Sequence, residues 1–275
     1  MSATPSSLPI PEPLSTFAPL NVDAIVTKLR AAGCVFAEDE AQLLISAAST
    51  PDDLATMVDR RAAGLPIEHV VGWADFCGHR FAVDPGVFVP RYRSQFLAAE
   101  AIALAQPGAV VVDLCCGSGA LGATVAAAHA NIELHAADID PVAVRCARRN
   151  LEPINGTVYQ GDLFHPLPAA LHCRINILIA NVPYVPTAEI ALLPAEARVH
   201  EALVALDGGT DGLDLLRRVT AIAPSWLAPG GHLLFETSDQ QAQLAVEAVI
   251  SSGLVPRIAT SEDLDATVII ATMPN

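Results

Sequence analysis

Basic residues are scarce in this 275-residue sequence, and lysine is almost missing. Lysine and arginine together number 15, against 30 aspartates and glutamates, and Lys28 is the one lysine. A protein that binds nucleic acid through its phosphates normally has a basic face. The net charge of −15 therefore argues against a broad nucleic-acid interface.

The sequence also lacks long apolar runs. A mostly apolar stretch such as residues 175–180 is far too short to cross a bilayer. The N-terminus has neither a basic n-region nor an apolar core, so we expect no signal peptide. Hydrophobic residues nevertheless make up 52% of the chain, which is ample for a packed core.

No C-x-x-C pair occurs among the six cysteines. The vicinal pair Cys115 and Cys116 is a poor disulfide candidate and offers too few ligands for zinc. We therefore expect buried, reduced cysteines, no metal and a cytoplasmic location. The others are Cys34, Cys77, Cys146 and Cys173.

Four segments are predicted from the composition. Residues 1–20 are rich in Pro, Ser and Thr and are expected to form a disordered leader. A small helical domain, which by itself indicates no chemistry, follows at 21–72, and a β-hairpin linker at 73–92 is punctuated by glycine and proline. Residues 93–275 form the largest domain.

Strands and helices alternate from residue 109 onward, which predicts an α/β fold with a parallel sheet covered on both faces. A short loop joins the last two strands, so we expect an antiparallel hairpin at the sheet edge. Strands are predicted at 109–114, 132–138, 156–160, 174–180, 230–236, 254–260 and 266–272. Helices are predicted at about 23–30, 37–48, 51–63, 94–104, 119–128, 141–150, 212–226 and 238–251.

The segment 110–122 has the pattern of a nucleotide cradle: an apolar strand, a glycine turn and the start of a helix. Gly117 and Gly119 allow a ligand to approach the backbone closely. Asp138 ends the next strand, 138 − 117 = 21 positions beyond Gly117, at the distance expected of an acid that binds ribose hydroxyls. Asp162 ends the third strand and is a candidate partner for an adenine amino group.

A dinucleotide site is the near alternative for this cradle. Asp113 lies before the glycine turn, where it would repel a pyrophosphate but would suit a sulfonium cation with an amino-acid tail. The final antiparallel hairpin also departs from an all-parallel dinucleotide fold. Both features favour S-adenosylmethionine (AdoMet) as the cofactor.

A second polar segment, Asn181-Val-Pro-Tyr184, follows the fourth strand. The Asn181 side chain and the Val182 backbone each offer a carbonyl, and together they can accept both N–H groups of a planar amide or amine. Pro183 stiffens the loop, and Tyr184 can pack on the face of the acceptor.

Four motifs occur in an order that resembles the HemK-like protein-(glutamine-N5) methyltransferases. They are Val89-Pro-Arg91, Asp113-Leu-x-x-Gly-Ser-Gly119, Asn181-x-Pro-Tyr184 and the glycine-rich segment 205–214. The resemblance covers about residues 22–273 and implies a Rossmann-like class I AdoMet-dependent methyltransferase with a seven-stranded, mostly parallel sheet. That family methylates the glutamine of the Gly-Gly-Gln loop of peptide-chain release factors, which would be the protein partner here.

Site roles follow from the cradle, the acceptor loop and this resemblance. The resemblance implies catalytic and acceptor-binding roles for the loop 181–184, with Arg91 also binding the acceptor. It also implies that the helical domain at 21–72 recognises the substrate. The expected AdoMet-binding residues are Asp113, Cys115, Gly117, Gly119, Asp138, Ile139, Asp162, Leu163 and Asn181.

The chain departs from the family at several positions. Val182 replaces a proline, which leaves the needed backbone carbonyl in place. Arg93 and Gln95 replace two acids near the expected cofactor site, Cys115 replaces a glycine, and His200-Glu201 stands where the family tends to have Glu-Pro. The changes at 93 and 95 bear on substrate choice and activity.

Three hypotheses remain open from the sequence. The first is a protein-glutamine methyltransferase, in which Asn181 and Val182 stabilise the charge that grows on the amide, with the methyl group ~3 Å away and no dedicated base. The second is an AdoMet-dependent N-methyltransferase for a nucleic-acid base or a small amine or amide. The third is a non-catalytic AdoMet-binding protein.

Overall fold

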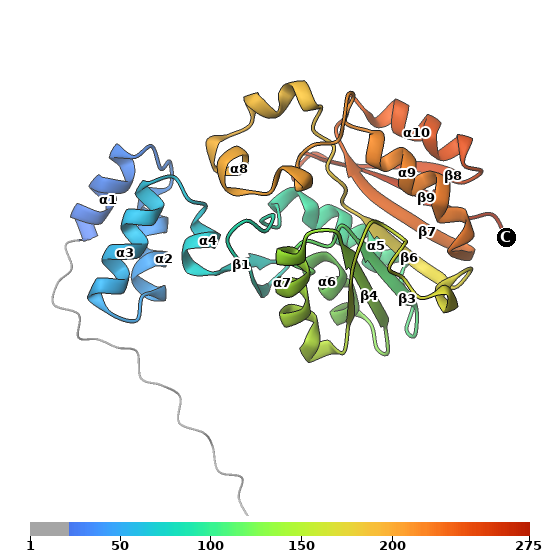
Figure 1. The fold of residues 1–275 in the computed structure, drawn as a ribbon, viewed down its shortest axis with the longest axis horizontal. Coiled ribbons are helices and arrows are strands. Elements are labelled where there is room, and N and C mark those ends of the chain that lie inside the picture. Colours follow the sequence, from blue (N-terminus) through green and yellow to red (C-terminus); the bar gives the residue numbers. More distant parts are fainter. Residues whose placement is uncertain (1–21) are drawn as a thin grey trace, which may run out of the picture. The chain divides into compact units, whose positions relative to one another are not determined.

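The computed structural model describes residues 22–275, so the expected leader at 1–20 lies outside the described residues. The chain divides into two compact units, with the boundary in the sequence between Leu65 and Pro66 (Figure 1). Among the described residues, no helix is long and apolar enough to cross a membrane.

The first unit is a group of three helices, α1 (Val22–Ala31), α2 (Ala37–Ala47) and α3 (Pro51–Ala62). Thr50 caps α3 by accepting a hydrogen bond from the Asp53 N–H, and a proline occupies the first turn, where no N–H is needed. The buried Arg61 guanidinium pairs with both carboxylate oxygens of Glu40, at 2.7 and 2.9 Å, and so ties α3 to α2.

The second unit begins with α4 (Ile67–Val71) and a two-stranded antiparallel hairpin, β1 (Trp73–Phe76) and β2 (His79–Ala82). The hairpin lies inside the segment predicted for it. The proposed domain boundaries stay a prediction. The helix α4 lies within the range 21–72 predicted for the helical domain, but it belongs to the larger unit by its contacts.

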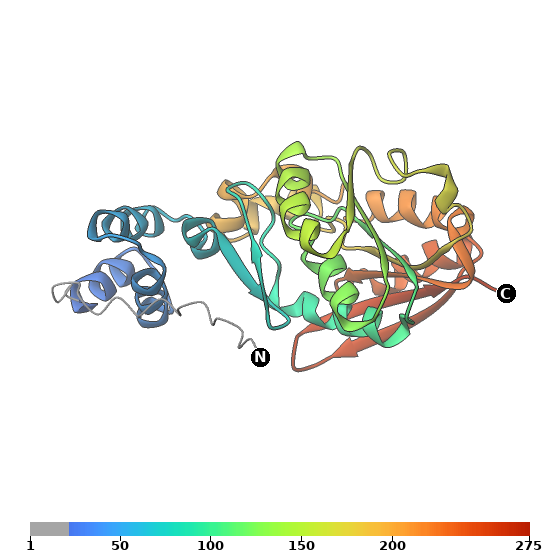
Figure 2. The same ribbon diagram turned by 90° about the horizontal axis from the view of Figure 1, so that it is seen from below.

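A seven-stranded sheet forms the centre of the second unit, with the strand order β5-β4-β3-β6-β7-β9-β8. All pairs are parallel except β7–β9 and β9–β8, so the final hairpin is antiparallel as predicted, with β8 at the edge. Figure 2 shows this pair in red at one side of the sheet. The strands are β3 (Val110–Leu114), β4 (Glu133–Asp138), β5 (Thr157–Gln160), β6 (Ile175–Ala180), β7 (Leu227–Thr237), β8 (Val255–Ser261) and β9 (Ala266–Thr272).

Helices cover both faces of the sheet because successive strand residues point to opposite sides. Val111 belongs to a core with α5, α6 and α7, whereas Val112 belongs to a core with α9 and α10. These helices are α5 (Gln95–Leu104), α6 (Ala120–Ala128), α7 (Pro141–Leu151), α9 (Asp214–Ile222) and α10 (Ala242–Ser251). The α/β fold with a mostly parallel seven-stranded sheet is confirmed.

Some element boundaries differ from the expectation. The helix expected at 212–226 is shorter, because a 3₁₀ turn at Ala223–Ser225, with proline inside it, follows α9. The helix expected from 238 begins at 242, after a turn closed by a hydrogen bond from the Gln241 N–H to the Ser238 carbonyl. Segment 187–205 contains helical turns that the sequence did not predict: Thr187–Leu192, α8 (Ala195–His200) and Leu203–Ala205. The remaining 3₁₀ turns are Tyr92–Ser94, Glu152–Ile154 and Ala169–Leu171.

No two cysteines form a disulfide in the described part of the chain. Cys34, Cys116 and Cys146 are buried as expected, whereas Cys173 is exposed. It lies in the turn before β6, with its Sγ 3.6 Å from the Ser225 carbonyl oxygen.

Candidate active site

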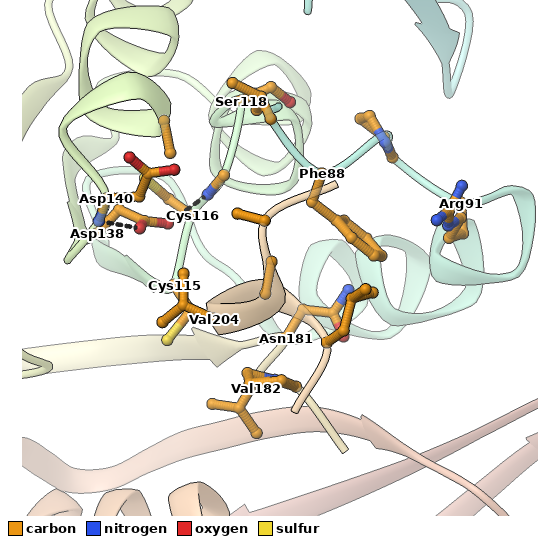
Figure 3. Close-up of a pocket in the computed structure, with 18 of the residues that line it drawn as sticks. Phe88, Arg91, Cys115, Cys116, Ser118, Asp138, Asp140, Asn181, Val182 and Val204 are labelled. Carbon is orange, nitrogen blue, oxygen red and sulfur yellow. Dashed lines mark hydrogen bonds between the residues drawn. The ribbon is translucent and has the colours of Figure 1, made fainter. Parts of the chain in front are cut away.

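A cavity of about 500 Å³ opens at the carboxyl ends of four neighbouring strands in the second unit. Cys115, Asp138, Asp162 and Asn181 lie at or just after the ends of β3, β4, β5 and β6, and all four line it. β3 lies where the strand order reverses, between β4 and β6, which is where ligands bind in open α/β sheets. Figure 3 shows three of these residues, Cys115, Asp138 and Asn181, around the same space.

The glycine turn after β3 winds tightly beneath this cavity. Cys115, Gly117 and Gly119 have positive φ angles of 54°, 55° and 79°, a conformation that glycine adopts without steric cost. The Gly119 N–H bonds back to the Cys116 carbonyl at 2.7 Å and closes the turn. Cys115 and Gly117 reach the cavity wall, whereas Gly119, at the start of α6, does not.

Asp138 connects the turn to the next strand. Its Oδ2 accepts a hydrogen bond from the Gly117 N–H and its Oδ1 accepts one from the Asp140 N–H, both at 2.9 Å. Burial raises the pKa of Asp138, and these backbone N–H groups oppose the rise. The neighbouring Ile139 is half exposed and lines the same cavity, so an apolar surface lies beside the carboxylate.

Asp113 lies below the glycine turn rather than on the cavity wall. It is fully buried, and its Oδ2 accepts a 2.9 Å hydrogen bond from the Gly122 N–H at the start of α6. Within residues 22–275, its Oδ1 has no hydrogen-bond partner. Burial raises the pKa of Asp113 to about 7, although the Gly122 N–H opposes this. The carboxylate therefore supports the shape of the turn from beneath.

At the end of β5, Asp162 and Leu163 both line the cavity. Asp162 pairs with Arg218 of α9 at 2.5 Å. The side chain of Leu163 is buried, and its φ of 49° is a left-handed conformation, which is uncommon for leucine. The sequence did not anticipate Arg218 as the partner of Asp162.

The loop after β6 supplies the polar wall opposite the glycine turn. Asn181, Val182, Pro183 and Tyr184 all line the cavity. The Asn181 Nδ2 donates a 3.4 Å hydrogen bond to the Ser94 Oγ. Its Oδ1 is buried and has no hydrogen-bond partner among the described residues. A buried acceptor without a partner is rare in folded proteins and indicates a ligand group or a water at that position.

The glycine-rich segment 205–214 packs behind this loop. A Cβ atom on Gly208 would stand 2.8 Å from the Pro183 carbonyl oxygen, so only glycine fits there. The Gln241 Nε2 donates to the Tyr184 carbonyl and to the Asp211 carbonyl, both at 2.9 Å, and joins the two segments. Close packing against the loop after β6 therefore explains why this segment carries glycine.

Glu236, which the sequence reasoning missed, lies at the centre of a polar network on the same wall. It is 3% exposed and follows the apolar part of β7. Its Oε1 accepts hydrogen bonds from the Arg93 Nε and the Tyr184 hydroxyl, and its Oε2 accepts one from the Ser94 hydroxyl, all at 2.7 Å. An acid at the end of a predicted strand is the same signal that identified Asp138, so the sequence contained a clue to it.

Arg91 lines the cavity and pairs with Glu201 at 2.5 Å. Glu201 is buried, and its other oxygen accepts a 3.1 Å hydrogen bond from the Val89 N–H. Burial raises the pKa of Glu201, and the Arg91 charge opposes this. Glu201 therefore fixes Arg91 at the cavity wall by an ion pair and a hydrogen bond.

The described residues hold no group of histidines, cysteines and acids that could bind a metal. Neither His200 nor His232 lines the cavity. His232 lies on β7 and its Nδ1 is 3.0 Å from the Thr272 hydroxyl. On this arrangement the cavity can hold a cofactor over the glycine turn and orient a planar polar group against Asn181.

The parallel sheet with its antiparallel final hairpin, and a cavity over the glycine turn, define a class I AdoMet-dependent methyltransferase fold. A methyltransferase from Pyrococcus furiosus shares the fold, with a TM-score of 0.56 at 16% identity, over 80% of this chain and 98% of that one. The model of the methyltransferase small domain matches residues 79–211.

Two relatives identify the family of methyltransferases within this class. The release factor glutamine methyltransferase of Geobacter sulfurreducens is 36% identical over 70% of this chain and 69% of its own length. The ribosomal protein uL3 glutamine methyltransferase of Bordetella pertussis is 38% identical over 67% of this chain and 64% of its own length. The chain belongs to the release factor glutamine methyltransferase family, as its four motifs suggested.

Proposed function

We propose that this enzyme transfers a methyl group from AdoMet to the side-chain amide nitrogen of a glutamine in a protein. The preferred acceptor is the Gly-Gly-Gln loop of a peptide-chain release factor, and ribosomal protein uL3 is the alternative, since a relative is named for each. Because both acceptors belong to the translation machinery, the proposal includes a cytoplasmic location.

One observation carries the proposal: the buried Oδ1 of Asn181 has no hydrogen-bond partner among residues 22–275, and Asn181 lines the cavity that Asp138 also lines. An acceptor of this kind suits an N–H donor of an incoming group. The NH₂ of a glutamine side chain has two such N–H groups, and the Val182 backbone carbonyl would accept the second.

The residues around the glycine turn fit AdoMet. A volume of about 500 Å³ is in the usual range for small-molecule sites. Asp138 would accept hydrogen bonds from ribose hydroxyls, since each carboxylate oxygen keeps a second lone pair beside its bond to a backbone N–H. Ile139 and Leu163 would offer apolar contact to the adenine, and Asp162 would meet its amino group. Cys115, Gly117 and Asn181 would border the methionine portion, with Asp113 and Gly119 shaping the turn from below.

AdoMet, when bound, supplies an activated methyl group: its S–CH₃ bond would break as the C–N bond forms, S-adenosylhomocysteine would be the leaving group, and the nitrogen would then lose one proton. The chain's own task is to make the amide nitrogen reactive, because its lone pair is delocalised into the carbonyl. Asn181 and Val182 would hold the NH₂ in place and stabilise the positive charge that grows on nitrogen as the lone pair localises. Tyr184 would pack on the flat face of the amide and Arg91 would contact the acceptor, so positioning is the main contribution of the site.

A protein acceptor fits the surface better than a nucleic acid does. The net charge is −15, and Val204, which borders the cavity, is an exposed apolar residue. Leu192, Val199 and Leu203 in the same helical segment are exposed as well. Phosphate-backbone binding needs basic side chains, whereas exposed apolar groups suit a protein surface.

We also propose that the helical domain at 21–72 takes part in recognising the protein acceptor. Two adjacent large apolar side chains between α1 and α2, Val35 and Phe36, are 82% and 67% exposed. Aromatic and apolar anchors of this kind are common in protein interfaces.

The decisive experiment uses AdoMet carrying a labelled methyl group. The enzyme is incubated separately with purified release factor, ribosomal protein uL3 and ribosomal RNA, and the label is mapped by mass spectrometry. Label on the Gly-Gly-Gln glutamine supports the proposal, and label on uL3 selects the alternative protein acceptor. Label on RNA alone, or AdoMet binding without any transfer, would overturn it.

A further inference from the structure

A chain of hydrogen bonds leads from the end of β7 to the carboxamide of Asn181. The Ser94 hydroxyl lies 2.7 Å from Glu236 Oε2 and 3.4 Å from Asn181 Nδ2. Ser94 is 2% exposed and Glu236 is 3% exposed, so water has little access to these groups. Three residues from separate elements of the second unit therefore form one buried relay.

The direction of this relay follows from the number of hydrogens available. A carboxylate only accepts hydrogen bonds, and a serine hydroxyl has a single hydrogen to donate. Ser94 donates that hydrogen to Glu236, so it can only accept from Asn181. Of the two ends of a carboxamide, only the nitrogen donates. The nitrogen of Asn181 must therefore face Ser94, and the oxygen must face away from it.

Two other neighbours keep Glu236 in the accepting role. The Arg93 guanidinium and the Tyr184 hydroxyl both donate to its Oε1, each at 2.7 Å. The Arg93 guanidinium and the Glu236 carboxylate form an ion pair, in which the arginine can only donate. Every hydrogen bond of Glu236 described above thus leaves its carboxylate as the acceptor.

We propose that Glu236 and Ser94 are positioning residues that set the orientation of the Asn181 carboxamide and thereby select glutamine over glutamate. With the orientation found here, Asn181 presents an acceptor that matches the NH₂ of glutamine and opposes a carboxylate, which can only accept. The inference rests on the proposed function for the identity of the acceptor. It adds the residues that decide which end of Asn181 meets that acceptor.

Substitutions can reverse or remove the relay. In Glu236→Gln the new amide can donate to Ser94, which frees the hydroxyl to donate to the Asn181 oxygen and turns the carboxamide around. Ser94→Ala removes the fixed partner of Asn181, whereas Ser94→Thr keeps the hydroxyl. Arg257→Met is the matched control, because it removes an ion pair, with Glu100, that lies outside the relay.

The first readout compares two peptides that carry Gly-Gly-Gln or Gly-Gly-Glu as competitors of methyl transfer. Wild type, Ser94→Thr and Arg257→Met are expected to prefer the glutamine peptide by at least tenfold. In Glu236→Gln the preference should fall to near one or invert, while AdoMet affinity, measured by calorimetry, stays within about twofold. Equal weakening of both peptides with an unchanged ratio would mean that Glu236 is merely structural, and would overturn the proposal.

The second readout does not depend on the acceptor. The side-chain NH₂ signals of ¹⁵N-labelled Asn181, assigned by their loss in Asn181→Asp, should be protected from solvent exchange in wild type and Ser94→Thr. Protection should be lost in Ser94→Ala. Unchanged protection in Ser94→Ala would refute the relay. If wild type shows the protected signals but methylates no glutamine, the proposed function fails while the orientation of Asn181 stands.

Discussion

The hydroxyl of Tyr184 donates a 2.7 Å hydrogen bond to Glu236 Oε1, and so joins the loop after β6 to the end of β7. The two residues are 52 positions apart in the sequence. Burial raises the pKa of Tyr184, the Glu236 charge raises it further, and Arg93 opposes this. The phenol therefore stays protonated at neutral pH and serves as a donor, not as a base.

Two substitutions of Tyr184 distinguish the contribution of its hydroxyl group to turnover from that of its ring. Tyr184→Phe keeps the apolar face for the acceptor and loses one hydrogen bond, so turnover should fall by about tenfold or less. Tyr184→Ala removes the ring as well and should cost at least tenfold more. Steady-state rates with labelled AdoMet measure both. Equal losses in the two variants would contradict a packing role for the ring.

Asn181→Ala removes the acceptor that is proposed to hold the substrate NH₂. Losing one such group costs roughly 10²–10³ in turnover at comparable sites, and AdoMet affinity should stay nearly intact. Single-turnover rates and calorimetry report the two quantities separately. Gln243→Ala, an exposed amide on α10, is the control and should behave as wild type. Loss of AdoMet binding in Asn181→Ala would show that Asn181 mainly serves the cofactor.

Asp138→Ala should weaken AdoMet binding more than it lowers the turnover rate, which is the opposite of the result expected for Asn181→Ala. It removes a ribose partner and also the acceptor of the Gly117 N–H, so the glycine turn loses a 2.9 Å hydrogen bond. We expect AdoMet affinity to fall by about 10- to 100-fold, equivalent to two hydrogen bonds at about 1 kcal/mol each or somewhat more. The turnover rate at saturating AdoMet should change much less. An unchanged dissociation constant for AdoMet would indicate that the cofactor does not bind at the end of β4.

The buried Asp113 makes stability depend on pH. Its pKa is raised from 3.8 to about 7 by burial, so between these values the folded state binds more protons than the unfolded state. The free energy of unfolding should therefore fall as the pH rises through this window. The stabilisation that comes from the raised pKa of Asp113 is fully present below about pH 4 and is lost above about pH 7. It amounts to on the order of 4 kcal/mol of unfolding free energy at most.

Asp113→Asn tests this directly, since an amide does not titrate. Urea unfolding at pH 4 to 8 should give a flatter pH dependence for the variant than for wild type. Asp263→Asn, at an exposed position in the β8–β9 loop, should reproduce the wild-type curve. Parallel curves for wild type and Asp113→Asn would show that Asp113 keeps an ordinary carboxyl pKa.

The exposed pair Val35 and Phe36 tests the role of the helical domain. A double substitution of both to serine should raise the KM for the intact protein acceptor by about three- to tenfold, because an exposed aromatic anchor is lost. Methylation of a short Gly-Gly-Gln peptide should be unaffected. An equal rise of KM for peptide and protein would point to unfolding of the domain, which circular dichroism would reveal.

Much of the fold was predictable because its signals are local. The alternation of apolar strands with amphipathic helices gave the strand positions within a few residues, and the short loop before β9 gave the antiparallel hairpin. The helical turns at 187–205 were missed because this segment has no clear apolar period. The end of α9 was placed too late because Pro224 is tolerated in the 3₁₀ turn that follows.

The glycine turn after β3 and the loop after β6 could be located from the residue pattern alone. Residues such as Gly117, Asp138 and Asn181 lie at strand ends, and the carboxyl ends of parallel strands share one edge of the sheet, so their meeting follows from the chain order. The orientation of the Asn181 side chain, in contrast, depends on contacts between residues that are far apart in the sequence. Ser94 and Glu236 are 142 positions apart, and a hydrogen bond between them depends on how α5 and β7 pack, which no local pattern encodes.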